Sequence, residues 1–201
     1  MIKKIRFGDP EDDEEVKIET RTKKKHRDIL ISVKDIQDEL VDTIYSDQMG
    51  KFSVRSREGN RYIMVICEIY SGEIMVEPMR KWMPGEMVKS YQVLVYWLKN
   101  CGATPKRHIL DIETSEEFKD ATQKHKTTFH LIPSHDHCRN RAKKDIQTFK
   151  NHLVSILCDR DENLPMKLWD FLLQQSKITL NLIRQSRLFR TISAYAHLYG
   201  P

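Results

Sequence analysis

Short apolar runs separated by turn residues fill the chain from about residue 42 onward, and they predict β-strands. The first three runs lie at 43–46, 61–67 and 73–77. The turn residues that separate them are Gly50, Gly59, Asn60, Ser71 and Gly72. Because glycine and asparagine favour the tight turns that join antiparallel neighbours, we predict that these strands form an antiparallel meander.

A change to helical spacing follows the meander. Pro84 begins a segment that ends near Asn100, and its apolar side chains recur on one helical face: Met87, Tyr91, Leu94, Val95 and Leu98. A strand at 108–110, a helix at 115–125 and a strand at 127–131 follow. The chain therefore returns to alternating strands and helices after the meander.

Two further helices complete the predicted pattern. The first is basic and has an apolar stripe made of Ala142, Ile146, Phe149, Leu153, Ile156 and Leu157. The second covers about 165–184. A hairpin meander followed by alternating elements predicts an α/β fold, in which helices flank a mixed five-stranded sheet.

Composition limits the class of protein. A chain of 201 residues that is 39% apolar and 31% charged is typical of one soluble globular domain. Residues 1–38 alternate acidic and basic blocks, so we expect a charged, disordered tail there and the folded domain at 39–201. The apolar runs are too short to span a bilayer and no signal-peptide pattern is present. We expect a nuclear or cytoplasmic protein with no membrane partner.

Cysteine and histidine usage gives no sign of a structural metal. The four cysteines are scattered without a Cys-x-x-Cys pair, which favours reduced thiols. His135, His137 and Cys138 lie close together before the basic helix, but their crowding hinders tetrahedral coordination by all three. We therefore expect no zinc site.

The basic helix is the first candidate for a functional surface. Its cations and those just before it are Arg139, Arg141, Lys143, Lys144 and Lys150. The net charge of +5 is compatible with a polyanionic partner, although a solvated surface helix has the same composition. Both interpretations stay open from these residues alone.

Two aspartates occupy strand ends. Asp47 follows the first strand and Asp111 follows the strand at 108–110. In a mixed sheet of this element order the two strand ends lie side by side. Adjacent carboxylates suit two-metal phosphoryl transfer, because hard divalent ions prefer oxygen ligands and one carboxylate can bridge both. Taken alone, each aspartate is better explained as a turn former or a helix cap.

Six stretches carry a resemblance to a known family. They are SDQMGKF at 46–52, RSREGNRYIMV at 55–65, HILDIE at 108–113, IQTFKNH at 146–152, LWD at 168–170 and TLNLIR at 179–184. Together they resemble the catalytic core of retroviral and retrotransposon integrases over about residues 45–200. The resemblance implies an RNase H-like fold and an Asp-Asp-Glu triad that uses two divalent ions, Mg²⁺ or Mn²⁺, to process and join DNA ends. Asp47 and Asp111 match the first two triad positions as catalytic residues and metal ligands.

The third triad position departs from the family. Family members have approximately Asn-Ala-Ala-Glu where this chain has Asn140-Arg141-Ala142-Lys143, so Lys143 aligns with the glutamate. Asp145, the nearest acid, lies about 200° around the helix from position 143 and across the apolar stripe. We therefore expect Lys143 to oppose the metal ions and the chain to hold no metal cofactor.

Three functions follow from these patterns. The first is a retroelement-derived pseudoenzyme, with an integrase-like core that binds DNA phosphates through Arg139, Arg141, Lys144 and Lys150 and does not catalyse strand transfer. The second is an active integrase that uses Mg²⁺ or Mn²⁺ with a substitute acid. The third is an interaction or homodimerisation scaffold, for which Trp169, Phe171 and Leu172 are candidate face residues, although burial in the core explains them about as well. The zinc module and barrel of full integrases are not recognisable, so we expect a core domain alone, without a small-molecule cofactor.

Overall fold

A computed structural model describes residues 42–111, 115–132 and 141–200 of the chain. The tail predicted for residues 1–38 and the histidine-rich segment at 135–138 lie outside these ranges. Within the described part, no helix combines the length and the apolar character needed to cross a membrane.

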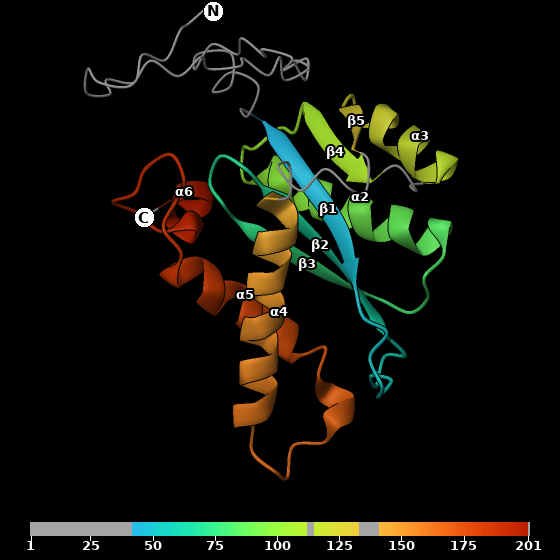
Figure 1. Cartoon of the computed structure of the whole chain (residues 1–201), viewed down its shortest axis with the longest axis vertical. Coiled ribbons are helices and arrows are strands. Elements are labelled where there is room, and N and C mark those ends of the chain that lie inside the picture. Colours follow the sequence, from blue (N-terminus) through green and yellow to red (C-terminus); the bar gives the residue numbers. More distant parts are fainter. Residues whose placement is uncertain (1–41, 112–114, 133–140, 201) are drawn as a thin grey trace, which may run out of the picture. The chain divides into compact units, whose positions relative to one another are not determined.

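The five strands form one mixed sheet (Figure 1). They are β1 (Thr43–Met49), β2 (Tyr62–Glu68), β3 (Ile74–Met79), β4 (Arg107–Asp111) and β5 (Thr128–Ile132). Their order across the sheet is β3-β2-β1-β4-β5. The first three strands pair antiparallel, whereas β4 pairs parallel with both β1 and β5. The predicted meander and the mixed five-stranded sheet are confirmed.

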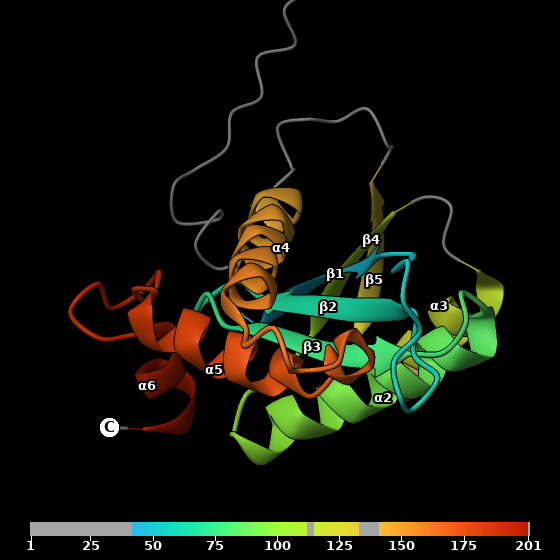
Figure 2. The same cartoon turned by 90° about the horizontal axis from the view of Figure 1, so that it is seen from below.

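Helices cover both faces of the sheet (Figure 2). Helices α2 (Pro84–Asn100) and α3 (Glu116–Lys124) lie on one face, and α4 (Arg141–Asp159) lies on the other. Helix α5 (Leu172–Ile183) packs against α4 and β3, and the short α6 (Ala194–Tyr199) packs against α5. The flanking helices predicted from the sequence are therefore present.

Strand alternation divides the core into two clusters. On β2, Met64 and Ile66 face α2 and α3, whereas Val65 and Cys67 face α4 and α5. This alternation is what a strand buried on both faces produces, since successive side chains point to opposite sides. The predicted apolar face of α2 is buried in the first cluster. On α4 the buried stripe consists of Ile146, Phe149 and Leu153.

Gly50 illustrates why the turn after β1 needs glycine. Its φ is +106°, a conformation that side chains with a Cβ rarely adopt. A Cβ at this position would also lie 2.9 Å from the carbonyl oxygen of Arg61, which is backbone and has little room to move. The loop that joins β1 to β2 can therefore begin in this conformation only with glycine at position 50.

The C-terminal part differs from the prediction of one helix at 165–184. A 3-10 helix, η2 (Met166–Leu168), comes first and α5 begins only at Leu172. The interruption is held by the loop before β2, because Trp169 stacks on Phe52 with ring centroids 4.3 Å apart and Asn60 Nδ2 donates to Asp170 Oδ2 at 2.9 Å. These contacts join residues more than a hundred positions apart, so local periodicity carries no sign of them.

Candidate active site

Strands β1 and β4 bring the two predicted aspartates to one end of the sheet. The parallel register pairs Thr43 with Arg107 and Tyr45 with Ile109. This pairing ends at Tyr45 and Ile109, and Asp47 and Asp111 each follow two residues later on their own strand. Asp47 is half-buried, and its Oδ1 accepts a hydrogen bond from the Gln48 backbone N–H at 2.8 Å. The two positions therefore lie on neighbouring strands where each strand ends.

A buried contact fixes β1 beside β4 one residue before Asp47. The Nε2 of His108 lies 2.8 Å from the Oγ of Ser46, and the His108 ring stacks on Tyr91 of α2 with centroids 5.0 Å apart. Burial lowers the pKa of His108 to about 3, so the ring is neutral at physiological pH. Because Ser46 and His108 point toward α2, strand alternation directs Asp47 to the opposite face, toward α4.

Helix α4 crosses this second face with its first turn near β1 (Figure 1). Ile146, Phe149 and Leu153 anchor it against β-strand residues such as Met49 and Val65. No acidic residue occurs in its first turn. Lys143 belongs to this turn, and its side chain lies outside the described part. The position expected for the triad glutamate is thus on the correct helix and carries a cation.

Asp145, the first acid on α4, has partners of its own. It is 7% exposed, and its Oδ1 accepts a hydrogen bond from Arg184 Nη2 at 2.8 Å. Its Oδ2 is paired with the Arg187 guanidinium and also accepts from the Cys67 thiol at 3.2 Å. Burial, reinforced by the neighbouring Asp145 charge, raises the pKa of Cys67, so the thiol keeps its proton and can donate it. Both oxygens of Asp145 are engaged away from β4.

Solved structures show what this arrangement resembles, although no family model and no curated protein matches the chain. The catalytic core domain of BIV integrase aligns over 78% of this chain and 93% of its own, with a TM-score of 0.57 and 13% identity. The catalytic core domain of HTLV-2 integrase in complex with magnesium, in its trimeric form, aligns over 78% and 95%, with a TM-score of 0.58 and 16% identity. A simian T-cell lymphotropic virus intasome in complex with a PP2A regulatory subunit covers 79% and 54%, with a TM-score of 0.61 and 15% identity.

The chain has the fold of a retroviral integrase catalytic core. The RNase H-like fold expected from the sequence is confirmed. At these identities the likeness is one of fold, and the chemistry of the site has to be judged from the residues of this chain.

A two-metal site in the integrase-like core would depend on the acids that β1, β4 and α4 provide. A pair of divalent ions needs several carboxylate oxygens. Asp47 and Asp111 provide two carboxylates, but helix α4 brings a lysine to the third position and its acid Asp145 is held by two arginines. Among the described side chains, no group of three or more His, Cys, Asp or Glu is placed to hold a metal ion.

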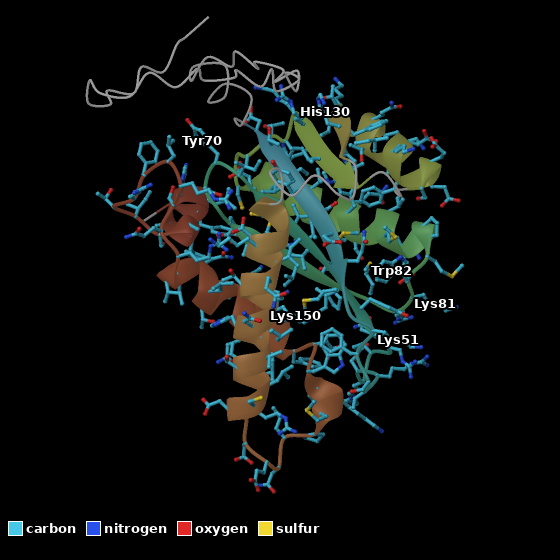
Figure 3. All side chains as sticks on the ribbon, viewed as in Figure 1. Lys51, Tyr70, Lys81, Trp82, His130 and Lys150 are labelled. Carbon is cyan, nitrogen blue, oxygen red and sulfur yellow. The ribbon has the colours of Figure 1, made fainter. Side chains whose placement is uncertain are left out.

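The predicted nucleic-acid-binding residues lie on different sides of α4. Lys144 and Lys150 are both exposed, but six residues at about 100° each separate them by about 120° around the helix axis. Figure 3 shows Lys150 halfway along the helix. Arg139 and the side chain of Arg141 lie outside the described part. The basic helix therefore presents at least two cationic surfaces instead of one.

A cavity that the sequence analysis missed lies beside Lys144. Its volume is about 620 Å³, and its lining consists of Lys144, Asp145, Arg184, Gln185, Ser186, Arg187 and Arg190. The sequence does contain one sign of this cavity: arginine recurs at every third position from Arg184 to Arg190. That spacing alone does not reveal that the segment folds back against α4.

The residues suggested for an interaction face separate in the structure. Trp169 is 1% exposed, and its indole N–H donates to the Val54 carbonyl at 3.0 Å, so it belongs to the core. Phe171 is exposed and Leu172 is partly buried. The prediction that Trp169 serves an interaction face was wrong, because the loop before β2 covers its ring.

Proposed function

We propose that this chain is an integrase-core-like domain that binds nucleic-acid phosphates and does not catalyse DNA strand transfer. The observation that carries the proposal is the set of residues at the start of helix α4. Its first turn contains Lys143 and no acid, and the next acid, Asp145, is committed to Arg184 and Arg187. A structurally similar integrase core was solved in complex with magnesium. The residues of this chain argue against magnesium binding at the corresponding place.

A lysine close to the metal site would repel divalent ions. An ammonium group about 4 Å from a divalent ion is repelled by about 8 kcal/mol at an effective dielectric constant near 20. Two metal ions also need enough anionic ligands to offset their mutual repulsion, and Asp47 and Asp111 supply only two charges. Lys143 beside them would favour an internal ion pair over metal binding.

An active enzyme with a substitute acid is the less favoured function. For Asp145 to ligate a metal ion, it would have to abandon Arg184, Arg187 and the Cys67 thiol. Removing one partner from a buried ion pair costs several kcal/mol, because the remaining charge stays buried without compensation. Glu113, which follows Asp111 closely, lies outside the described part.

Nucleic-acid binding is supported by charge and position. The net charge is +5, and α4 exposes Lys144 on one side and Lys150 on another. Contacts of lysine and arginine with phosphates give affinity without sequence preference and release counterions, so binding weakens steeply with salt. We expect DNA to be held as a polyanion and not read at its bases.

An activity assay tests the catalytic half of the proposal. The full chain would be incubated with a labelled DNA duplex and a supercoiled plasmid in the presence of Mg²⁺ or Mn²⁺. We expect neither end processing nor joining. Divalent-ion-dependent products that disappear in Asp47→Asn would contradict the proposal, because they would require a functioning carboxylate site.

Self-association is a second candidate function, which one observation favours. Helix α2 exposes a stripe of large apolar side chains, with Val93, Tyr96 and Trp97 accessible over 39%, 64% and 49% of their surfaces. Trp97 lies beside α5, since Lys177 Nζ is 4.9 Å from its ring centroid. A contiguous stripe of exposed apolar residues on one helix is typical of a protein interface. We propose that this face of α2 forms a homodimer surface.

A further inference from the structure

The cavity beside Lys144 has an unusual composition for its size. It lies where the segment between α5 and α6 approaches the N-terminal half of α4 (Figure 1). Four cationic side chains and one carboxylate line about 620 Å³, a formal excess of three positive charges. Its remaining lining residues, Gln185 and Ser186, are polar as well. The charges of the lining therefore favour an anionic ligand over an apolar one.

Asp145 organises two of the cations before any ligand arrives. The carboxylate pairs with Arg184 through one oxygen and with Arg187 through the other. These arginines are partly buried, with 17% and 27% of their side chains exposed. Each guanidinium has five N–H donors and cannot exhaust them on one carboxylate oxygen. Donors on both arginines therefore remain available at a fixed location.

The β2–β3 turn fixes the other side of this segment. The Leu188 backbone N–H donates to the Tyr70 carbonyl at 3.3 Å, and Arg187 Nη1 donates to the Ile69 carbonyl at 3.5 Å. Figure 3 shows Tyr70 at this junction. Gly72 in the turn has φ +78°, and a Cβ there would lie 3.4 Å from Arg187 Cγ. The arginines are thus held by contacts on two sides, which lowers the entropy lost when a ligand binds.

We propose that this cavity binds a compact polyphosphate, meaning a free or nucleoside-linked di- or triphosphate. Guanidinium groups match phosphate oxygens with paired, charge-assisted hydrogen bonds, and Lys144 adds a point charge. A triphosphate concentrates three or more negative charges within a few ångströms, which matches the excess of three positive charges. The volume lies within the range of small-ligand sites.

A nucleic-acid backbone fits this cavity less well. Its phosphates carry one charge each and are spread along the chain, so few of them reach one concave site at a time. The exposed cations elsewhere on α4, such as Lys150, suit that extended ligand better. The polyphosphate site shares Lys144 with the DNA-binding surface proposed above, whereas Lys150 belongs to the DNA-binding surface alone and separates the two in a test.

Titration calorimetry of the full chain with inorganic triphosphate tests the proposal, in metal-free buffer at constant ionic strength. We expect saturable binding with one site per chain and at least tenfold weaker binding of orthophosphate. Adenosine triphosphate serves as a second probe. Tighter binding than inorganic triphosphate would support a nucleoside-linked ligand, and equal binding would support a free polyphosphate.

Charge reversal locates the site. The double variant Lys144→Glu, Arg190→Glu changes two exposed lining residues, and we expect at least a tenfold loss of triphosphate affinity. The matched control Lys150→Glu, Lys167→Glu changes two exposed cations that do not line the cavity, and its affinity should stay within twofold. Thermal melting checks that both variants fold. If the first does not, Arg190→Gln alone should weaken binding about threefold.

Two outcomes would overturn the proposal. They are the absence of saturable triphosphate binding by the wild-type chain and an equal loss of triphosphate affinity in the lining and control variants.

Discussion

Asp145 Oδ1 accepts a hydrogen bond from Arg184 Nη2 at 2.8 Å, which ties the second turn of α4 to the residue directly after α5. Arg187 completes the pairing from three residues further along. Asp145, the acid nearest to the position that aligns with the triad glutamate, is therefore a structural ion-pair partner. This relationship separates the basic cavity from the aspartates on β1 and β4.

Replacing Asp145 with asparagine should destabilise the fold. The change leaves Arg184 and Arg187 partly buried without a counter-charge, and we expect a loss of about 3 kcal/mol in the free energy of unfolding. Urea denaturation monitored by circular dichroism measures it. Asp159→Asn, at the exposed end of the same helix, is the control and should change stability by less than about 0.5 kcal/mol. Equal effects of the two substitutions would mean that the ion pairs contribute little.

Stability should also depend on the protonation of Glu73. Burial raises its pKa from 4.5 to about 8, against the opposing charges of Lys177 and Arg184. Between these two values the folded chain holds a proton that the unfolded chain releases, so stability is lost as pH rises from 4.5 to 8. The slope reaches at most about 1.4 kcal/mol per pH unit.

The substitution Glu73→Gln tests this dependence. Glutamine resembles the protonated acid and can still accept the hydrogen bond that Asn181 Nδ2 gives to Oε1 at 2.8 Å. We expect the variant to match the wild type below about pH 4 and to be more stable by a few kcal/mol near pH 8. Urea unfolding across this range gives the difference curve between the two proteins. If the stability of the two proteins changes with pH in parallel, the pKa of Glu73 is not raised.

DNA binding should respond to the two exposed lysines of α4. In the double variant Lys144→Glu, Lys150→Glu we expect weaker binding at low salt. The slope of log affinity against log salt should flatten by about 1.8, if each lysine neutralises one phosphate of duplex DNA. Fluorescence anisotropy at several salt concentrations measures both. Unaltered affinity and slope would leave α4 a plain solvated helix.

Self-association should depend on the exposed stripe of α2. Tyr96→Lys introduces a charge into the proposed homodimer surface, and we expect the dimer to dissociate at least tenfold more readily. Sedimentation velocity over a range of protein concentrations measures this. Trp82→Lys is the control, because Trp82 is similarly exposed at 52% but lies before α2 (Figure 3). If the wild-type chain stays monomeric at high protein concentration, the homodimer proposal is wrong.

Much of the fold could be predicted because its signals are local. Alternation in β2 and the helical stripe of α2 reflect burial directly, and the observed sheet follows from their order. The short α6 was missed because six residues carry too little periodicity. The break before α5 was missed because Asn60 and Asp170 cause it from a distance of 110 positions.

Only part of the candidate site could be predicted from the sequence, for the same reason. Asp47 and Asp111 could be assigned to the ends of β1 and β4 because each belongs to a recognisable apolar run, and these two strands are neighbours in the sheet. The cavity could not, because Asp145 meets Arg184 and Arg187 only after α5 has packed on α4. Long-range ion pairs of this kind have no counterpart in residue spacing.

The most direct test of the central claim is calorimetry with Mn²⁺ on the wild-type chain and on Lys143→Glu. The substitution restores a carboxylate to the first turn of α4, so we predict no measurable Mn²⁺ binding by the wild type and at least a tenfold gain in the variant. Lys144→Glu makes the same charge change one residue away, beside the basic cavity, and should show no gain. Tight Mn²⁺ binding by the wild-type chain that is abolished by Asp111→Asn would contradict the account, because it would show that the two aspartates hold metal despite Lys143.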